Sequence, residues 1–255
     1  MESSDAPCTL SDWFQRAARG PSGQNIAAIE SNSGRELTYF QLNEQANVFA
    51  SNLCIELSKF SEIIDRPVCL HMHRSIDWYI AYVGCSRLGV PIVCHSRDLS
   101  DKVAESARWA DITSLLSPLF VISDEPTDAS SIPFIHFMKE LPSMPDWPSK
   151  PDSSIMSYHF TGGSTYSSKC VVITEAMVTH ELQAYTKICT LYKPTMVLQN
   201  SSTYWPASAF GQLNIAIAFS ACVVFANSVS NDIINTCQID CIGVVPSVLQ
   251  SLAFV

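Results

Sequence analysis

The last third of this 255-residue chain has very little charge. Residues 1–150 carry 31 of the 39 Asp, Glu, Lys and Arg side chains, and from Pro194 onward only Asp232 and Asp240 are charged. The chain as a whole is 47% hydrophobic, a composition that excludes a disordered or collagen-like protein. Such a charge-poor stretch predicts a segment that packs inside something larger.

The sequence also lacks basic runs and long apolar runs. A net charge of −9 excludes general binding to nucleic-acid phosphates, which requires clustered Lys and Arg. The longest apolar run, from Ile215 to Ala226, contains Ser220 and is too short to span a bilayer. Residues 1–8 are polar and acidic, unlike a secretory signal. We therefore expect a cytoplasmic protein with no membrane span and no nucleic-acid partner.

Ten cysteines are present, but none of them forms a Cys-x-x-Cys pair. Cys237 and Cys241 are close in sequence, yet no second pair of Cys or His residues follows them. Without a secretory signal, a disulfide framework is not expected. We interpret the thiols as small buried side chains in a reducing compartment rather than as metal ligands.

From Pro67 onward, strand patterns alternate with helix patterns. Strands separated by helices of this length predict right-handed βαβ units and a parallel sheet, which is an α/β fold with helices flanking the sheet. We expect residues 67–185 to form this first lobe. Its predicted strands are 68–72, 90–94, 120–123 and 155–160, and its predicted helices are 75–88, 100–110 and 176–191.

Further elements are predicted at both ends of the chain. Helical periodicity is clear in residues 9–19 and 39–57, and a turn at residues 32–34 joins two short strands into a hairpin. Residues 125–152 contain six prolines and predict a loop-rich connector. Towards the end, strands are predicted at 195–198, 223–226 and 241–245, and helices at 210–219 and from 247 onward.

One loop of small residues carries the clearest chemical signal. The predicted strand that ends at Phe160 runs directly into Ser, Thr and Gly residues, and a lysine follows them. Backbone N–H groups and hydroxyls in such a loop can surround phosphate oxygens, although a plain flexible loop is the alternative. It is not a Walker A loop, because the lysine lies between Ser168 and Cys170. The candidate phosphate-binding residues are Thr161, Gly162, Gly163, Ser164, Thr165 and Lys169.

This loop resembles the phosphate-binding signature of the adenylate-forming superfamily, which reads approximately Thr-Ser-Gly-Thr-Thr-Gly-x-Pro-Lys-Gly-Val. The superfamily includes acyl-CoA synthetases and the adenylation domains of nonribosomal peptide synthetases and related reductases. Other segments resemble its motifs in the same order: 36–47 (ELTYFQLNEQAN), 68–98, 205–211 (WPASAFG), which resembles a segment lining the acyl pocket, and 244–249 (VVPSVL). Residues 96–100 and 246–253 are most similar to the fungal reductase type.

The resemblance implies a reaction in which a carboxylate attacks the α-phosphate of ATP and pyrophosphate leaves. The acyl-adenylate is then transferred to the thiol of CoA or of a carrier protein's phosphopantetheine. ATP and Mg²⁺ are the implied cofactors, a small carboxylic acid the substrate, and a carrier-protein domain a partner. The family's β/γ-phosphate loop corresponds to the candidate residues Thr161 to Thr165 and Lys169. By the same resemblance, residues 1–66 and 186–255 form an incomplete second lobe, so that 1–255 is a partial N-terminal domain.

Three loop positions depart from the family pattern. Tyr166 and Cys170 each stand where the family has glycine, and Ser168 replaces proline. A tyrosine costs about 1 kcal/mol or more where a left-handed backbone is required. His159, next to the loop, is interpreted as a structural histidine rather than as a general base.

The family's later motifs should follow Pro246, and they are not in this sequence. We therefore assign no catalytic or metal-binding residue. The apolar end at residues 252–255 is typical of a truncated domain. The first interpretation is a truncated ligase domain that does not turn over by itself. The alternative is a non-catalytic pseudoenzyme that acts as a nucleotide-binding or protein-interaction module.

Overall fold

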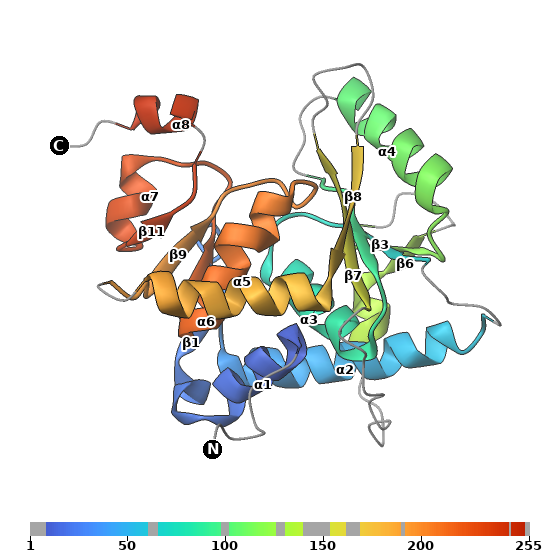
Figure 1. Ribbon diagram of the computed structural model, residues 1–255, viewed down its shortest axis with the longest axis horizontal. Coiled ribbons are helices and arrows are strands. Elements are labelled where there is room, and N and C mark those ends of the chain that lie inside the picture. Colours follow the sequence, from blue (N-terminus) through green and yellow to red (C-terminus); the bar gives the residue numbers. More distant parts are fainter. Residues whose placement is uncertain are drawn as a thin grey trace.

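The computed structural model describes residues 9–60, 66–97, 102–125, 131–139, 154–161, 169–189, 192–244 and 246–252. Its helices and strands form two mostly parallel sheets flanked by helices, which confirms the predicted α/β class (Figure 1). In Figure 1 the six-stranded sheet lies on the right and the five-stranded sheet on the left.

The six-stranded sheet has the order β6-β5-β3-β4-β7-β8. Neighbouring strands are parallel except for the last pair, β7 and β8, which is antiparallel. Helix α3 (Ile76–Leu88) connects β3 to β4, and α4 (Lys102–Leu116) connects β4 to β5. The strands are β3 (Val68–His71), β4 (Ile92–Cys94), β5 (Val121–Ser123), β6 (Ser131–Pro133), β7 (Ile155–Thr161) and β8 (Lys169–Thr174).

The five-stranded sheet has the order β11-β9-β10-β1-β2 and combines strands from both ends of the chain. Every residue of its central strand β10 is buried. This position explains why β10 itself carries no charge, because both of its faces and both of its edges are covered by protein. The strands are β1 (Ile26–Glu30), β2 (Glu36–Thr38), β9 (Met196–Gln199), β10 (Cys222–Phe225) and β11 (Cys241–Ile242).

The main helices begin at side-chain caps. Thr9 and Thr38 form capping boxes at the starts of α1 (Leu10–Arg19) and α2 (Tyr39–Leu57), and Ser75 caps α3. Gly89, with φ +74°, ends α3 in the left-handed conformation that glycine adopts at low cost. Thr174 caps α5 (Glu175–Ile188) at the end of β8.

A single apolar core joins the two sheets. It includes Val68 from β3 and Val223 from β10, so residues of both sheets belong to one cluster. Helices α2 and α3 pack on each other, as do α5 and α6 (Asn214–Phe219), while α1 contacts all four (Figure 1). The hydroxyl of Tyr39 donates a hydrogen bond to the carbonyl of Ala221 at 2.7 Å, which ties α2 to the chain just before β10.

The structure corrects several sequence predictions. Strands β6 and β8 and helix α7 (Asn231–Thr236) were not expected, and the connector at 125–152 contains β6 and the 3-10 helix η2 (Phe134–Met138). The helix predicted at 210–219 is wrong in its first half, because a kinked turn, η4 (Ala209–Leu213), precedes α6. The remaining short elements are η1 (Pro21–Gln24), η3 (Pro206–Ser208) and α8 (Pro246–Ser251).

Within the described ranges, no helix combines the length and the hydropathy that crossing a membrane requires.

Candidate functional site

The predicted phosphate loop connects β7 to β8. The backbone of Thr161 ends β7, Lys169 begins β8, and the two residues are paired across the antiparallel ladder. The structure therefore brings both ends of the predicted loop together, with the Lys169 side chain exposed. The other predicted residues, Gly162, Gly163, Ser164 and Thr165, lie outside the described residues.

His159 lies on β7 two residues before the loop and is buried, with 3% of its surface exposed. Its Nε2 lies 3.0 Å from the hydroxyl oxygen of Ser157, and its ring meets Phe210 edge-on at 6.1 Å between centroids. Burial lowers the pKa of His159 to about 4. The imidazole is therefore neutral at pH 7, and it links β7 to the kinked turn instead of supplying a positive charge for phosphate.

A pocket of about 460 Å³ lies on the other side of this contact. It forms where β9 and β11 end and where the kinked turn η4 crosses in front of them. Carboxyl ends of parallel strands are the usual place for a ligand in an open α/β sheet. The pocket is lined by Asn200, Ser201, Ala207, Phe210, Gly211, Gln212, Gly243, Val244 and Val248.

Gln212 holds the wall of this pocket together. Its side-chain oxygen accepts hydrogen bonds from the backbone N–H groups of Asn200 (3.3 Å) and Ser201 (3.2 Å). Its Nε2 donates to the Asn200 side-chain oxygen at 2.9 Å and to the Gly243 carbonyl at 3.0 Å. Gln212 is 1% exposed, so one buried amide joins the ends of β9 and β11 to η4.

The kink that shapes the pocket is held by Glu181 on α5. Gly211 has φ +84°, and its N–H donates to Glu181 Oε1 at 3.1 Å. The hydroxyl of Tyr185 donates to the same oxygen at 2.7 Å, and the amide of Asn214 donates to Oε2 at 2.6 Å. Burial holds the pKa of Glu181 above its usual value, although these three hydrogen bonds act in the opposite direction. The carboxylate thus replaces the helical acceptors that the kinked backbone has lost.

An aromatic cluster connects the pocket segment to α4 and β7. Tyr204 stacks on Phe160 at 5.6 Å between ring centroids. The guanidinium carbon of Arg108, on α4, lies 4.5 Å from the Tyr204 ring centroid and 5.2 Å from that of Trp205. These contacts place the segment 204–211 directly against the strand that leads into the predicted loop.

The sequence pointed to the segment 205–211 but not to Asn200, Gln212 or Glu181. These residues come from separate parts of the chain, and no local pattern distinguishes them from exposed polar residues. For Asn200 and Gln212, the low charge of the surrounding sequence is an indication, since a Gln or Asn between apolar residues is often a buried hydrogen-bonding group.

A family model described as AMP-binding enzyme matches residues 14–254. Among curated proteins, the chain is 24% identical over 240 residues to the hybrid PKS-NRPS synthetase prlS of a fungal species (strain NRRL 50135). That match covers 88% of this chain and 6% of the synthetase.

Two solved structures show the same fold. The N-terminal subdomain of Klebsiella oxytoca NpsA, in complex with 3-hydroxyanthranilyl-AMSN, matches with a TM-score of 0.72 and 19% identity, over 89% of this chain and 56% of that one. The o-succinylbenzoate CoA synthetase MenE of Bacillus subtilis, with the acyl-adenylate OSB-AMP, matches with a TM-score of 0.77 and 17% identity, over 94% and 49%. The chain therefore spans about half the length of these two solved chains.

Proposed function

The chain belongs to the AMP-binding enzyme family, and from that premise we propose that it is the N-terminal part of an adenylation domain that activates a carboxylic acid with ATP. The carboxylate attacks the α-phosphate, pyrophosphate leaves, and the acyl-adenylate passes to the thiol of CoA or of a carrier-protein phosphopantetheine. Mg²⁺ accompanies ATP, and we assign it no protein ligand in this chain. We place this activity in the cytoplasm. Residues 67–185 form the first lobe, and residues 1–66 with 186–255 form part of the second.

The main support for this proposal is a contact between β7, the strand that leads into the predicted loop, and the wall of the pocket. His159 on β7 packs against Phe210, which lines the 460 Å³ pocket. A phosphate bound at the β7–β8 connection and a carboxylic acid held in the pocket would therefore occupy adjoining places. Positioning the two reactants in this way supplies much of the catalysis in such a reaction.

Within this proposal, Lys169 neutralises the β- and γ-phosphates. We expect Lys169→Ala to weaken ATP binding about tenfold, because a charge-assisted contact to phosphate contributes roughly 1.5 kcal/mol or more. AMP lacks these phosphates, so its affinity should change less than twofold. Isothermal titration calorimetry of the full chain with each nucleotide measures both effects.

Lys187→Ala is the matched control, since Lys187 is also exposed but lies near the end of α5. Equal effects of the two substitutions on ATP binding would mean that Lys169 contributes only general positive charge. Failure of the wild-type chain to bind ATP would contradict the nucleotide-binding role itself.

The second candidate function is a non-catalytic nucleotide-binding or interaction module, and Tyr166 in place of a loop glycine favours it. An ATP–pyrophosphate exchange assay with a mixture of carboxylic acids measures whether the chain forms an acyl-adenylate, and so distinguishes the two candidate functions. We expect residues 1–255 alone to exchange no pyrophosphate, because they span about half the length of the structural relatives. Measurable exchange would show that this chain holds the whole activity and would exclude the module.

A further inference from the structure

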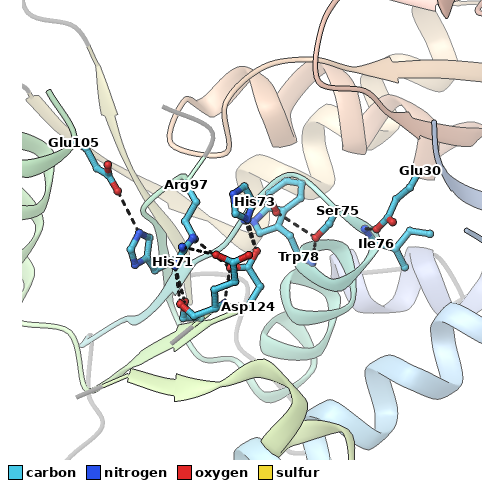
Figure 2. A network of polar contacts seen from close by, with 11 residues as sticks. Glu30, His71, His73, Ser75, Ile76, Trp78, Arg97, Glu105 and Asp124 are labelled. Atoms are coloured by element: carbon cyan, nitrogen blue, oxygen red, sulfur yellow. Dashed lines mark hydrogen bonds and ion pairs between the residues drawn. The ribbon is translucent and has the colours of Figure 1, made fainter. Parts of the chain in front are cut away.

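Two histidines and a glutamate meet at the carboxyl ends of β3 and β4, the two central strands of the six-stranded sheet. His71 is the last residue of β3, and His95 directly follows β4. Leu70 and Cys94 are paired in the parallel ladder, so the next residue of each strand lies beside the other. Glu105 lies in the first turn of α4 and points toward His71 (Figure 2).

The three side chains are close enough to share one ion. The rings of His71 and His95 stack with 4.4 Å between their centroids, and Nε2 of His71 lies 3.6 Å from Oε1 of Glu105. One potential ligand atom from each residue lies within 4.8 Å of the other two. Zn²⁺ bound at about 2.1 Å in a tetrahedral site places its ligand atoms about 3.4 Å apart. We expect a bound ion to draw the three ligand atoms closer together to this spacing.

Two buried nitrogen atoms in this cluster lack a hydrogen-bond partner among the described residues. They are Nε2 of His71 and Nδ1 of His95. The other nitrogen of His95, Nε2, lies 3.3 Å from the backbone carbonyl oxygen of Glu105. Because a carbonyl oxygen can only accept a hydrogen bond, Nε2 must carry the proton. That hydrogen bond leaves Nδ1 as the unprotonated nitrogen with a free lone pair. Histidines that bind metals are commonly oriented in this way by a carbonyl on their second nitrogen.

A simple ion pair between His71 and Glu105 does not account for the cluster. Nε2 of His71 and Oε1 of Glu105 are 3.6 Å apart, which is too long for a hydrogen bond. A pair between these two residues would also leave Nδ1 of His95 buried without a partner in the described part of the chain.

We propose that His71, His95 and Glu105 bind a divalent transition-metal ion of the Zn²⁺ class. Two imidazole nitrogens and one carboxylate form a donor set typical of Zn²⁺ sites with one open position, and a poor one for Mg²⁺, which prefers oxygen ligands. The ion would fasten the start of α4 to the carboxyl ends of β3 and β4. None of the three residues belongs to the candidate phosphate loop or lines the 460 Å³ pocket.

The test is equilibrium dialysis of the reduced full chain against Zn²⁺, with wild type and Glu105→Gln compared. We expect the wild-type chain to bind one equivalent of Zn²⁺ at this site. Glu105→Gln should bind that equivalent about tenfold more weakly or worse, since loss of a supporting residue alone commonly has that effect. Glu105 is half-buried and glutamine has the same shape, so this variant should fold. His95→Gln, examined by circular dichroism for its fold, should also lose the equivalent.

Glu36→Gln is the matched control, because Glu36 is an exposed carboxylate on β2 of the other sheet. The many thiols of the chain also bind Zn²⁺, and Co²⁺ distinguishes them through the thiolate charge-transfer band. Co²⁺ at the proposed site should show ligand-field absorption without that band, and Glu105→Gln should abolish it. Unchanged binding by Glu105→Gln, or an equal loss in Glu36→Gln, would overturn the proposal.

Discussion

Glu181→Ala is expected to lower the free energy of unfolding by about 3 kcal/mol, because it removes the acceptor of three hydrogen bonds at once. The hydroxyl of Tyr185, the N–H of Gly211 and the amide of the fully buried Asn214 would lose their partner. A cavity left by the missing side chain adds to this loss. Urea denaturation followed by circular dichroism measures the change.

His180→Ala is the control on the same helix, since His180 is exposed and adjacent to Glu181. It should change the free energy of unfolding by less than about 0.5 kcal/mol. If both variants lose a similar small amount, Glu181 does not hold the kink. If the assignment is right, Glu181→Ala should also weaken binding of any ligand in the 460 Å³ pocket, since Gly211 and Gln212 line it.

Gly84→Val is expected to destabilise the protein by about 3 kcal/mol through overpacking between α2 and α3. A Cβ atom at Gly84 would lie 2.5 Å from Cδ1 of Phe49 and 3.2 Å from the carbonyl oxygen of Ala46. Phe49 is buried between Phe134 and Phe137, at 5.7 Å and 5.2 Å between ring centroids, so it has little room to move. Replacing glycine inside a helix normally stabilises by up to about 1 kcal/mol, and here the steric effect reverses that sign.

Ala110→Val provides the control for adding a branched side chain to a helix, because Ala110 is exposed on α4. A double variant, Gly84→Val with Phe49→Leu, should recover part of the lost stability, since the smaller side chain makes space for the valine. Urea denaturation of the wild type, the two single variants Gly84→Val and Phe49→Leu, and the double variant gives the coupling energy between the two positions. Additive effects in this cycle would contradict a direct clash.

Local signals in the sequence predict the helices well. The boundaries of α2 agree with the prediction because Thr38 caps the helix and an apolar residue recurs with helical spacing until Leu57. The predicted boundaries of β3, α3 and β4 lie within two residues of the observed ones, and Ser75 and Gly89 mark the ends of the helix. These signals depend only on residues that are close in the sequence, so they can be recognised without knowledge of the fold.

The missed elements depend on contacts between distant residues. Strand β8 carries an exposed Lys169 and an exposed Val172, and its pairing with β7 is what makes it a strand. The helical periodicity from Phe210 onward is real, but the backbone kinks because Glu181, thirty residues earlier, accepts the N–H of Gly211. Tertiary contacts override local preference in both places.

The two candidate sites differ in how far the sequence could reveal them. The small-residue loop ending at Lys169 is a contiguous pattern, so its place after a strand could be predicted, whereas β8 on its other side was missed. His71, His95 and Glu105 lie on three different elements, and their proximity follows from the register of β3 and β4. A histidine at the end of one buried strand and another directly after the next are the hint that the sequence contains.

The pairing of β1 with β10 has a consequence for the order of folding during synthesis. Ala28 and Val223 are partners in this ladder, although about 195 residues separate them in the chain. At a synthesis rate of about 5–20 residues per second, the β1–β2 hairpin leaves the ribosome about 10–40 s before its parallel neighbour. During that interval one edge of β1 has unsatisfied backbone groups. The N-terminal hairpin therefore stays unpaired along that edge until β10 has been synthesised, and completion of the five-stranded sheet is expected to be a late, slow step.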